Sequence, residues 1–144
     1  MEQYSIVGMW LNQRGVSEVC SLIPGDYPNG LFRGNLLHYE SSKRIKGGLT
    51  DKIGNSIIIG KLDFEEQKLS FKKEYTGKNK SCFNYKFEKR GDLWVGNFYV
   101  KKRKEGDALC EISQNRKMKF NWNAININDY IDIESAIKLI GLSN

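Results

Sequence analysis

Segments in which apolar and polar residues alternate dominate the chain between residues 55 and 113. Alternation with a period of two is the pattern of a β-strand that has one buried face. The alternating segments are 55–63, 67–75, 80–88, 92–103 and 107–113, and the polar joints between them are 64–66, 76–79, 89–91 and 104–106. Such short joints connect antiparallel strands, because parallel strands need a crossover of about a dozen residues or more. The pattern therefore predicts a β-meander that closes into a barrel.

The N-terminal part of the chain adds further candidate strands at 5–13, 16–23, 31–39 and 44–50, and a weaker one follows the meander at 117–122. Residues 24–30 contain both prolines of the chain and two glycines, which predicts a loop. We expect a mainly β, single-domain protein over residues 1–144. Its core would be one antiparallel up-and-down barrel of about eight strands, spanning residues 5–122.

The last part of the chain changes its period. Ile133, Ala136, Ile137 and Ile140 fall on one stripe of a helix, with Asp129 or Asp132 available as the N-terminal cap. The spacing predicts a short amphipathic helix within 129–141. We expect it to pack on the flank of the barrel or to cap one of its ends, and a contact with a partner is the alternative.

Composition and charge narrow the class of protein. The chain has 144 residues, 40% of them hydrophobic, which suits one folded domain. Three widely spaced cysteines favour reduced thiols in a cytoplasmic protein, and we expect no secretory signal, membrane span or membrane partner. The formal net charge is +6, and the excess lies mainly in residues 61–120. This surplus indicates either an anionic partner or a solvated lysine-rich exterior.

No enzymatic or metal-binding motif appears along the chain. His38 is the single histidine, no Cys-x-x-Cys pair is present, and no glycine-rich phosphate loop occurs. A nucleophile–histidine pair would have to use His38. We therefore expect no metal and no cofactor, and a binding protein rather than an enzyme. A barrel enzyme without strong acid–base residues remains a third hypothesis.

The N-terminal strand resembles that of calycin barrels, the fold group of lipocalins and avidins. The resemblance rests on Gly8-Met9-Trp10, on the extension through Asn12, Gln13 and Gly15 to Ser17, and on Trp94-Val95-Gly96-Asn97-Phe98. It implies a closed barrel with Trp10 packed across one end. It also implies polar ligand contacts at Asn12 and Ser17, an aromatic contact at Tyr39 and a wall at Trp94. The strand that walls biotin in avidins corresponds to residues 69–73, which lack Trp, so the resemblance implies the fold rather than biotin binding.

Two functions follow from these features. The first is a non-enzymatic protein that holds a small, anionic ligand in the barrel pocket. Its pocket would comprise Trp10, Asn12, Ser17, Tyr39, Phe71, Tyr85 and Trp94, with anion contacts at Lys73, Lys102 and Arg103 on the rim. The alternative is a filled barrel whose basic face binds a protein or nucleic acid. A polar cavity would favour the first function, and a packed interior with lysines on one outer face would favour the second.

Overall fold

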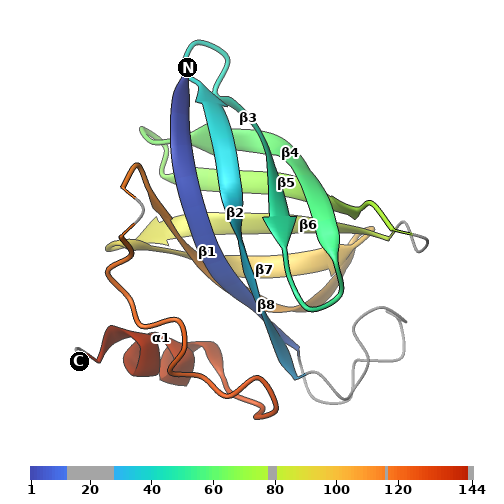
Figure 1. Ribbon diagram of the computed structural model, residues 1–144, viewed down its shortest axis with the longest axis vertical. Helices are drawn as coiled ribbons and strands as arrows, with labels where there is room; N and C mark the ends of the chain where they lie inside the picture. Colours follow the sequence, from blue (N-terminus) through green and yellow to red (C-terminus); the bar gives the residue numbers. More distant parts are fainter. Residues whose placement is uncertain (13–27, 78–80, 116, 143–144) are drawn as a thin grey trace.

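The computed structural model describes residues 1–12, 28–77, 81–115 and 117–142. Eight antiparallel strands follow one another around a closed barrel, in which β8 pairs with β1 (Figure 1). The strands are β1 (Glu2–Asn12), β2 (Asn29–Tyr39), β3 (Arg44–Thr50), β4 (Asn55–Asp63), β5 (Lys68–Tyr75), β6 (Cys82–Arg90), β7 (Leu93–Val100) and β8 (Arg103–Ser113). The predicted up-and-down barrel is confirmed, and it is compatible with a calycin-like fold.

Alternation along the strands fills the interior with apolar side chains. Every strand contributes to one cluster of buried hydrophobic residues. An aromatic stack runs through its centre: the ring of Tyr85 lies 5.0 Å from that of Phe71, 5.6 Å from that of Phe98 and 5.9 Å from that of Phe87. Barrels of eight strands are just wide enough for side chains to fill them. Here large aromatic residues occupy that space.

The turns at the two ends of β4 fold over opposite ends of the barrel. At one end, Ile53 of the β3–β4 turn packs against the interior cluster. At the other end, the ring of Phe64 in the β4–β5 turn lies 5.4 Å from that of His38 and 6.3 Å from that of Trp94. The imidazole of His38 is buried and bonds the carbonyl oxygen of Leu62 through Nε2 at 2.9 Å. The lone histidine therefore belongs to an aromatic closure of the barrel.

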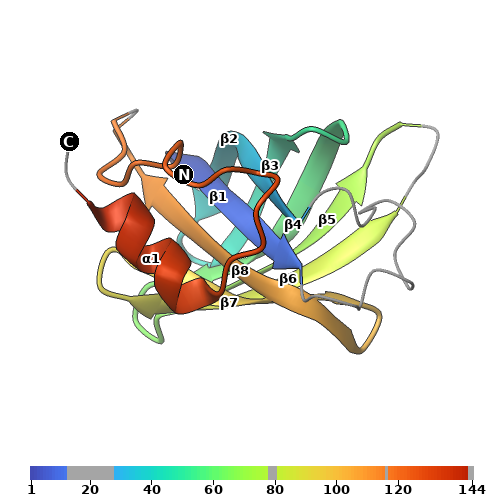
Figure 2. The same ribbon diagram turned by 90° about the horizontal axis from the view of Figure 1, so that it is seen from below.

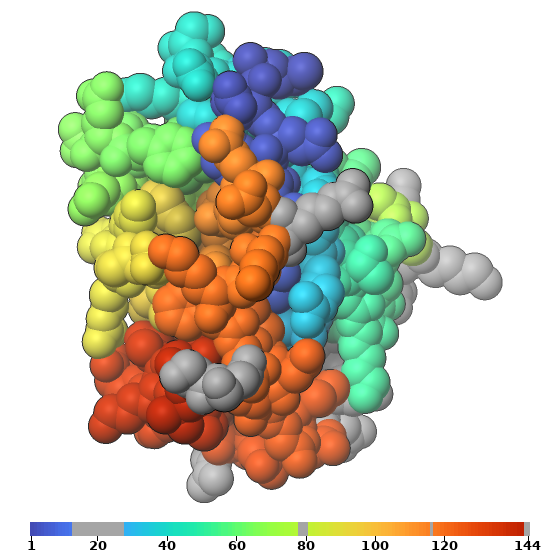
Figure 3. Space-filling view, turned by 60° about the vertical axis from the view of Figure 1, so that its left-hand side comes forward, coloured from blue at the N-terminus to red at the C-terminus, as the bar shows by residue number. Residues whose placement is uncertain are grey.

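The C-terminal segment lies against the flank of the barrel, where Figure 2 shows α1 (Ile133–Gly141) beside β7 and β8. In Figure 3 the red helix lies at the lower end of the face, next to orange residues. Asp132 caps the helix by accepting the backbone N–H of Ser135. Ala136 and Ile140 are buried in a second hydrophobic cluster, between the helix and the outward side chains of β1 and β8. The structure thus confirms the predicted helix and places it on the flank rather than in an end.

Several predicted boundaries differ from the structure, and one predicted strand does not form. The strand predicted at 92–103 ends at Val100, because Lys101 adopts a left-handed conformation (φ 57°) and turns the chain. The predicted joint at 104–106 therefore lies within β8, where the pairing register shifts opposite Phe98. Residues 117–122 form no strand, since they extend toward the second hydrophobic cluster instead. The strand predicted at 16–23 lies outside the described residues.

Candidate functional site

A buried ion pair lies inside the end of the barrel that the β3–β4 turn covers. The Lys73 ammonium donates to Oδ2 of Asp51, and both side chains are fully buried. The hydroxyl of Tyr75 donates to the same oxygen at 2.7 Å. The other oxygen of Asp51 accepts the backbone N–H groups of Ile53 and Gly54, at 2.9 and 3.3 Å. The turn therefore holds its own carboxylate against the lysine.

Aromatic rings enclose the Lys73 ammonium. Its Nζ lies 4.7 Å from the ring centroid of Tyr75, 4.8 Å from that of Trp10, 5.4 Å from that of Phe32 and 5.7 Å from that of Tyr85. Proteins use such cages to bind cations. Burial lowers the pKa of Lys73, and the charge and hydrogen bond of Asp51 oppose that shift. The cage is thus occupied by the protein's own cation.

Four buried side-chain polar atoms in the described part of the chain have no hydrogen-bond partner. They are Nε1 of Trp10, Oδ1 of Asn29, Nδ1 of His38 and Oε1 of Glu105. Burial raises the pKa of the Glu105 carboxyl, and nearby Arg103 partly opposes this effect. Buried polar groups are normally hydrogen-bonded, so each exception calls for an explanation.

A second candidate site lies on the outer face of the sheet. The backbone pairing places Lys46, Ile59, Lys72, Asn84 and Tyr99 in one row across β3 to β7. The neighbouring row across β3 to β6 contains Arg44, Lys61, Ser70 and Lys86. The β7–β8 turn adds two exposed lysines at one end of these rows. We define the basic track as Arg44, Lys46, Lys61, Lys72, Lys86, Lys101 and Lys102.

The cations of the basic track are exposed and lack acidic partners. Within the described residues, none of them forms an ion pair with Asp or Glu. Glu74 lies two residues beyond Lys72 on β5, and Asp107 is engaged with Asn97 and Lys104 on the edge of the same face. Glu88 lies two residues beyond Lys86 on β6 in the same way. The cations still outnumber these nearby acids, so the track carries a net positive charge.

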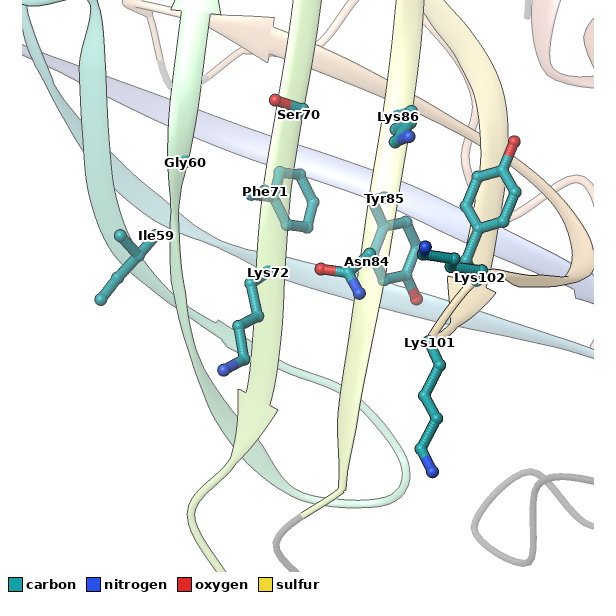
Figure 4. A pocket seen from close by; sticks show the side chains of 11 residues that line it. Ile59, Gly60, Ser70, Phe71, Lys72, Asn84, Tyr85, Lys86, Lys101 and Lys102 are labelled. Atoms are coloured by element: carbon teal, nitrogen blue, oxygen red, sulfur yellow. The ribbon is translucent and has the colours of Figure 1, made fainter.

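A groove of about 370 Å³ crosses the basic track over β4 to β7. Figure 4 shows Lys72, Asn84 and Lys86 on adjacent strands, with Lys101 and Lys102 beside them. Tyr99 also lines the groove, and the ammonium of Lys86 lies 5.4 Å from its ring centroid. The groove combines cations with an amide and an aromatic ring. Phosphates and bases use these groups as partners.

The residues predicted to line a pocket occupy several different places. Trp10, Phe71, Tyr85 and Trp94 are buried within the interior cluster. Trp10 lies beside Lys73 at one end of the barrel, whereas Trp94 contacts Phe64 at the other, so these two tryptophans do not share one site.

Asn12 is half-buried where β1 ends. Ser17 lies outside the described residues.

Two predicted orientations are wrong. Tyr39 was expected to face the interior, but it is 39% exposed on the outer face, because His38 is the residue of that pair that points inward. Lys73 was expected on the solvated rim, yet its side chain is fully buried, since it shares the inward face of β5 with Phe71 and Tyr75. Lys102 and Arg103 are exposed, as expected of anion contacts, although Arg103 pairs with Val100 at the barrel end rather than lying in the track.

Sequence reasoning missed Asp51 and the contributions of β3 and β4 to the track. Asp51 follows β3 in a short polar turn, where acidic residues are common for local reasons. Its partner Lys73 could be identified only from the closed barrel, which brings the two side chains together. Alternation along β3 and β4 indicates that Arg44, Lys46 and Lys61 point outward. Their alignment with Lys72 and Lys86 depends on strand register, which the sequence does not give.

The described residues contain no cluster of His, Cys, Asp or Glu that could hold a metal ion. No helix within the described ranges combines the length and the apolarity needed to cross a membrane. Cys110 is buried, and burial, with Glu111 nearby, raises the pKa of its thiol well above the usual value. Cys82 is half-buried on the outward side of β6.

Comparison with known proteins yields no relative: no family model, curated protein or solved structure matches the chain.

Proposed function

We propose that this protein is a non-enzymatic binding module whose basic track holds the phosphate backbone of a nucleic acid. The observation behind the proposal is the set of unpaired cations in two rows across β3 to β6, continued by two lysines of the β7–β8 turn, on the outside of a barrel whose interior is packed. Lysine and arginine contacts to phosphate supply most of the sequence-independent affinity for nucleic acids.

The dimensions of the track suit several consecutive phosphates. Neighbouring strands lie about 4.8 Å apart, so the five strands β3 to β7 span roughly 19 Å across the face. Small barrels bind segments of about four nucleotides or more through a charged groove of this kind. The groove around Lys72 and Lys86 marks where the backbone would lie deepest.

The packed interior also supports an outer-face function. Aromatic rings of Phe71, Tyr85 and Phe98 stack where a ligand of a hollow barrel would lie. The Lys73 ammonium is already neutralised by Asp51. Binding outside the barrel leaves this core intact.

The test is fluorescence anisotropy of a labelled oligonucleotide at increasing salt concentration. Affinity should fall as salt rises, and the double variant Lys72→Gln/Lys86→Gln should weaken binding. For a single strand, each lost phosphate contact should reduce the salt slope by about 0.7. Lys138→Gln on α1 removes an exposed lysine away from the track and serves as the matched control. Absent or salt-insensitive binding, or an equal effect of the control, would contradict the proposal.

A second candidate function is the binding of a small anionic ligand at the Lys73 end of the barrel. The buried Trp10 Nε1 without a partner favours it, as does the calycin-like Gly-x-Trp of β1. Native mass spectrometry of gently purified protein tests this candidate. A reproducible adduct lost on denaturation would support it, and a bare chain mass would leave the outer face as the binding surface.

A further inference from the structure

A hollow of about 500 Å³ lies on the outer face beside the basic track, over β2 to β4. Its sides are formed by Leu37 and Tyr39 on β2 and by Ile57 on β4. Between them, β3 contributes Gly47 to the lining, and Gly48 lies in the outward row between Asn35 and Ile57. Tyr39 is 39% and Ile57 46% exposed. Because Gly48 carries no side chain on this outward row, an apolar hollow with an aromatic edge is left.

The two glycines differ in what the fold requires of them. A Cβ at Gly47 would collide with the carbonyl oxygen of Asn35, so close strand packing explains that glycine. A Cβ at Gly48 would meet only the carbonyl oxygen of Ser56, at 3.5 Å, which is ordinary contact. Gly48 is also outside the left-handed region that favours glycine. Packing of the described residues thus gives no reason for glycine at position 48, but an open hollow does.

Polar groups around the hollow point to the kind of occupant. Gln3 and Asn35 line it with exposed amides, which can donate to and accept from the edge of a base. Lys46 lines the hollow and also belongs to the basic track. The site therefore offers an apolar and aromatic surface, amides at its edge and a cation at its exit. A flat heteroaromatic group attached to a phosphate matches this combination.

We propose that the hollow receives an unpaired nucleobase of a single strand whose phosphates follow the basic track. This inference rests on the proposed function and adds that the partner is single-stranded. The row through Leu37, Lys46, Ile59 and Lys72 connects the hollow directly to the track. A base in a duplex is stacked and paired, so it cannot enter the hollow. Stacking on Tyr39 and contact with Ile57 tolerate any base.

The experiment fills the hollow with a larger side chain and leaves every lysine and arginine of the basic track unchanged. Gly48→Leu places an apolar side chain in the open space. Gly141→Leu is the matched control, because a Cβ at that position also has room, with nothing within 4 Å of it. Binding of a single strand, a duplex and an abasic strand of equal length is measured by anisotropy. We expect the wild type to prefer the single strand. We expect Gly48→Leu to weaken that binding about 5-fold to 100-fold, the range for one stacked base, and to leave abasic binding unchanged.

The outcomes separate this inference from the proposed function. Equal wild-type affinity for single, duplex and abasic strands overturns the base site, while salt-dependent binding keeps the phosphate track. Loss of binding to every nucleic acid overturns both. Tyr39→Ala, at an exposed position, provides a second variant in case Gly48→Leu does not fold, and its unaltered single-strand affinity would also overturn the base site. Binding of an acidic aromatic peptide that Gly48→Leu abolishes, without any preference for bases, would assign the hollow to a protein instead.

Discussion

Lys73 and Asp51 form the only ion pair in the described part of the chain whose two side chains are both fully buried. The pair joins the β3–β4 turn to the inward face of β5 across the end of the barrel. Removing two charges from water is costly, and a buried pair compensates for this only when its other hydrogen bonds are satisfied. Tyr75 and the turn amides complete the carboxylate's partners here.

Breaking this pair should destabilise the barrel strongly. Asp51→Ala leaves the Lys73 charge buried without a partner, a change that typically costs about 3–5 kcal/mol. Urea denaturation measures the free energy of unfolding. Lys72→Ala, the exposed neighbour on the opposite face of β5, is the control and should change it little. Equal stability of Asp51→Ala and the wild type would show that Lys73 is neutral or solvated in the folded protein.

Glu105 should make stability depend on pH in a defined direction. Burial raises its pKa above the ordinary value of 4.5, so the folded state holds the proton more tightly than the unfolded chain. This contribution is fully present below pH 4.5 and is lost as the pH rises through the raised pKa. Glu105→Gln does not titrate. The unfolding free energy of the wild type minus that of the variant should therefore decrease from acid to neutral pH in denaturation curves. A constant or rising difference would contradict this assignment.

The sequence predicted the barrel because its alternation is local. Alternation places Phe71, Lys73 and Tyr75 on one face of their strand, and all three are buried in the structure. The fate of Lys73 could not be predicted, because a lysine is buried only when a partner such as Asp51 is available. That partner lies in a turn 22 residues earlier in the chain. The positive charge of Lys73 therefore indicated a position on the rim, while the alternation along the strand indicated the interior.

The orientation of Tyr39 failed for a related reason. His38 and Tyr39 lie next to each other in β2, so one must point inward and the other outward. The resemblance to calycin barrels implied an inward tyrosine. In the structure the histidine is buried instead, where its ring bonds the carbonyl oxygen of Leu62 and packs against the ring of Phe64. The hollow beside Gly48 was likewise hidden, because it depends on how β2, β3 and β4 align.

Glu111 should anchor the C-terminal segment. Its carboxylate accepts the backbone N–H groups of Lys119 and Phe120, at 2.7 and 3.3 Å, and Nε1 of Trp122 at 3.0 Å. Glu111→Ala would leave these donors without their acceptor, which should lower the free energy of unfolding by at least about 2 kcal/mol. We expect faster proteolysis within residues 117–142 and a shifted Trp fluorescence. Glu134 also lies in the C-terminal segment, where it forms an exposed ion pair with Arg90 of β6. Glu134→Ala breaks this pair and should change the free energy of unfolding only slightly. Equal proteolysis of both variants would exclude an anchoring role for Glu111.

Two glycines on adjacent strands should respond in opposite ways to the same substitution. A Cβ at Gly60 would collide with the carbonyl oxygen of Ser70 and with the backbone of Phe71, because β4 and β5 approach closely there. Gly60→Ala should therefore cost about 1–3 kcal/mol, as overpacked sites do. Gly48 has room for a methyl group, and alanine restricts the unfolded chain more than glycine does, so Gly48→Ala should be neutral or stabilise by up to about 1 kcal/mol.

Urea denaturation of both alanine variants measures the difference directly. A loss of stability in Gly48→Ala comparable to that in Gly60→Ala would mean that the fold itself requires glycine at position 48, and the hollow would then need no function to explain it. A tolerated Gly48→Ala combined with weaker binding of a single strand would instead separate the role of this glycine from folding. Gly48 would then serve ligand binding, because the absence of its side chain keeps the hollow open for a base.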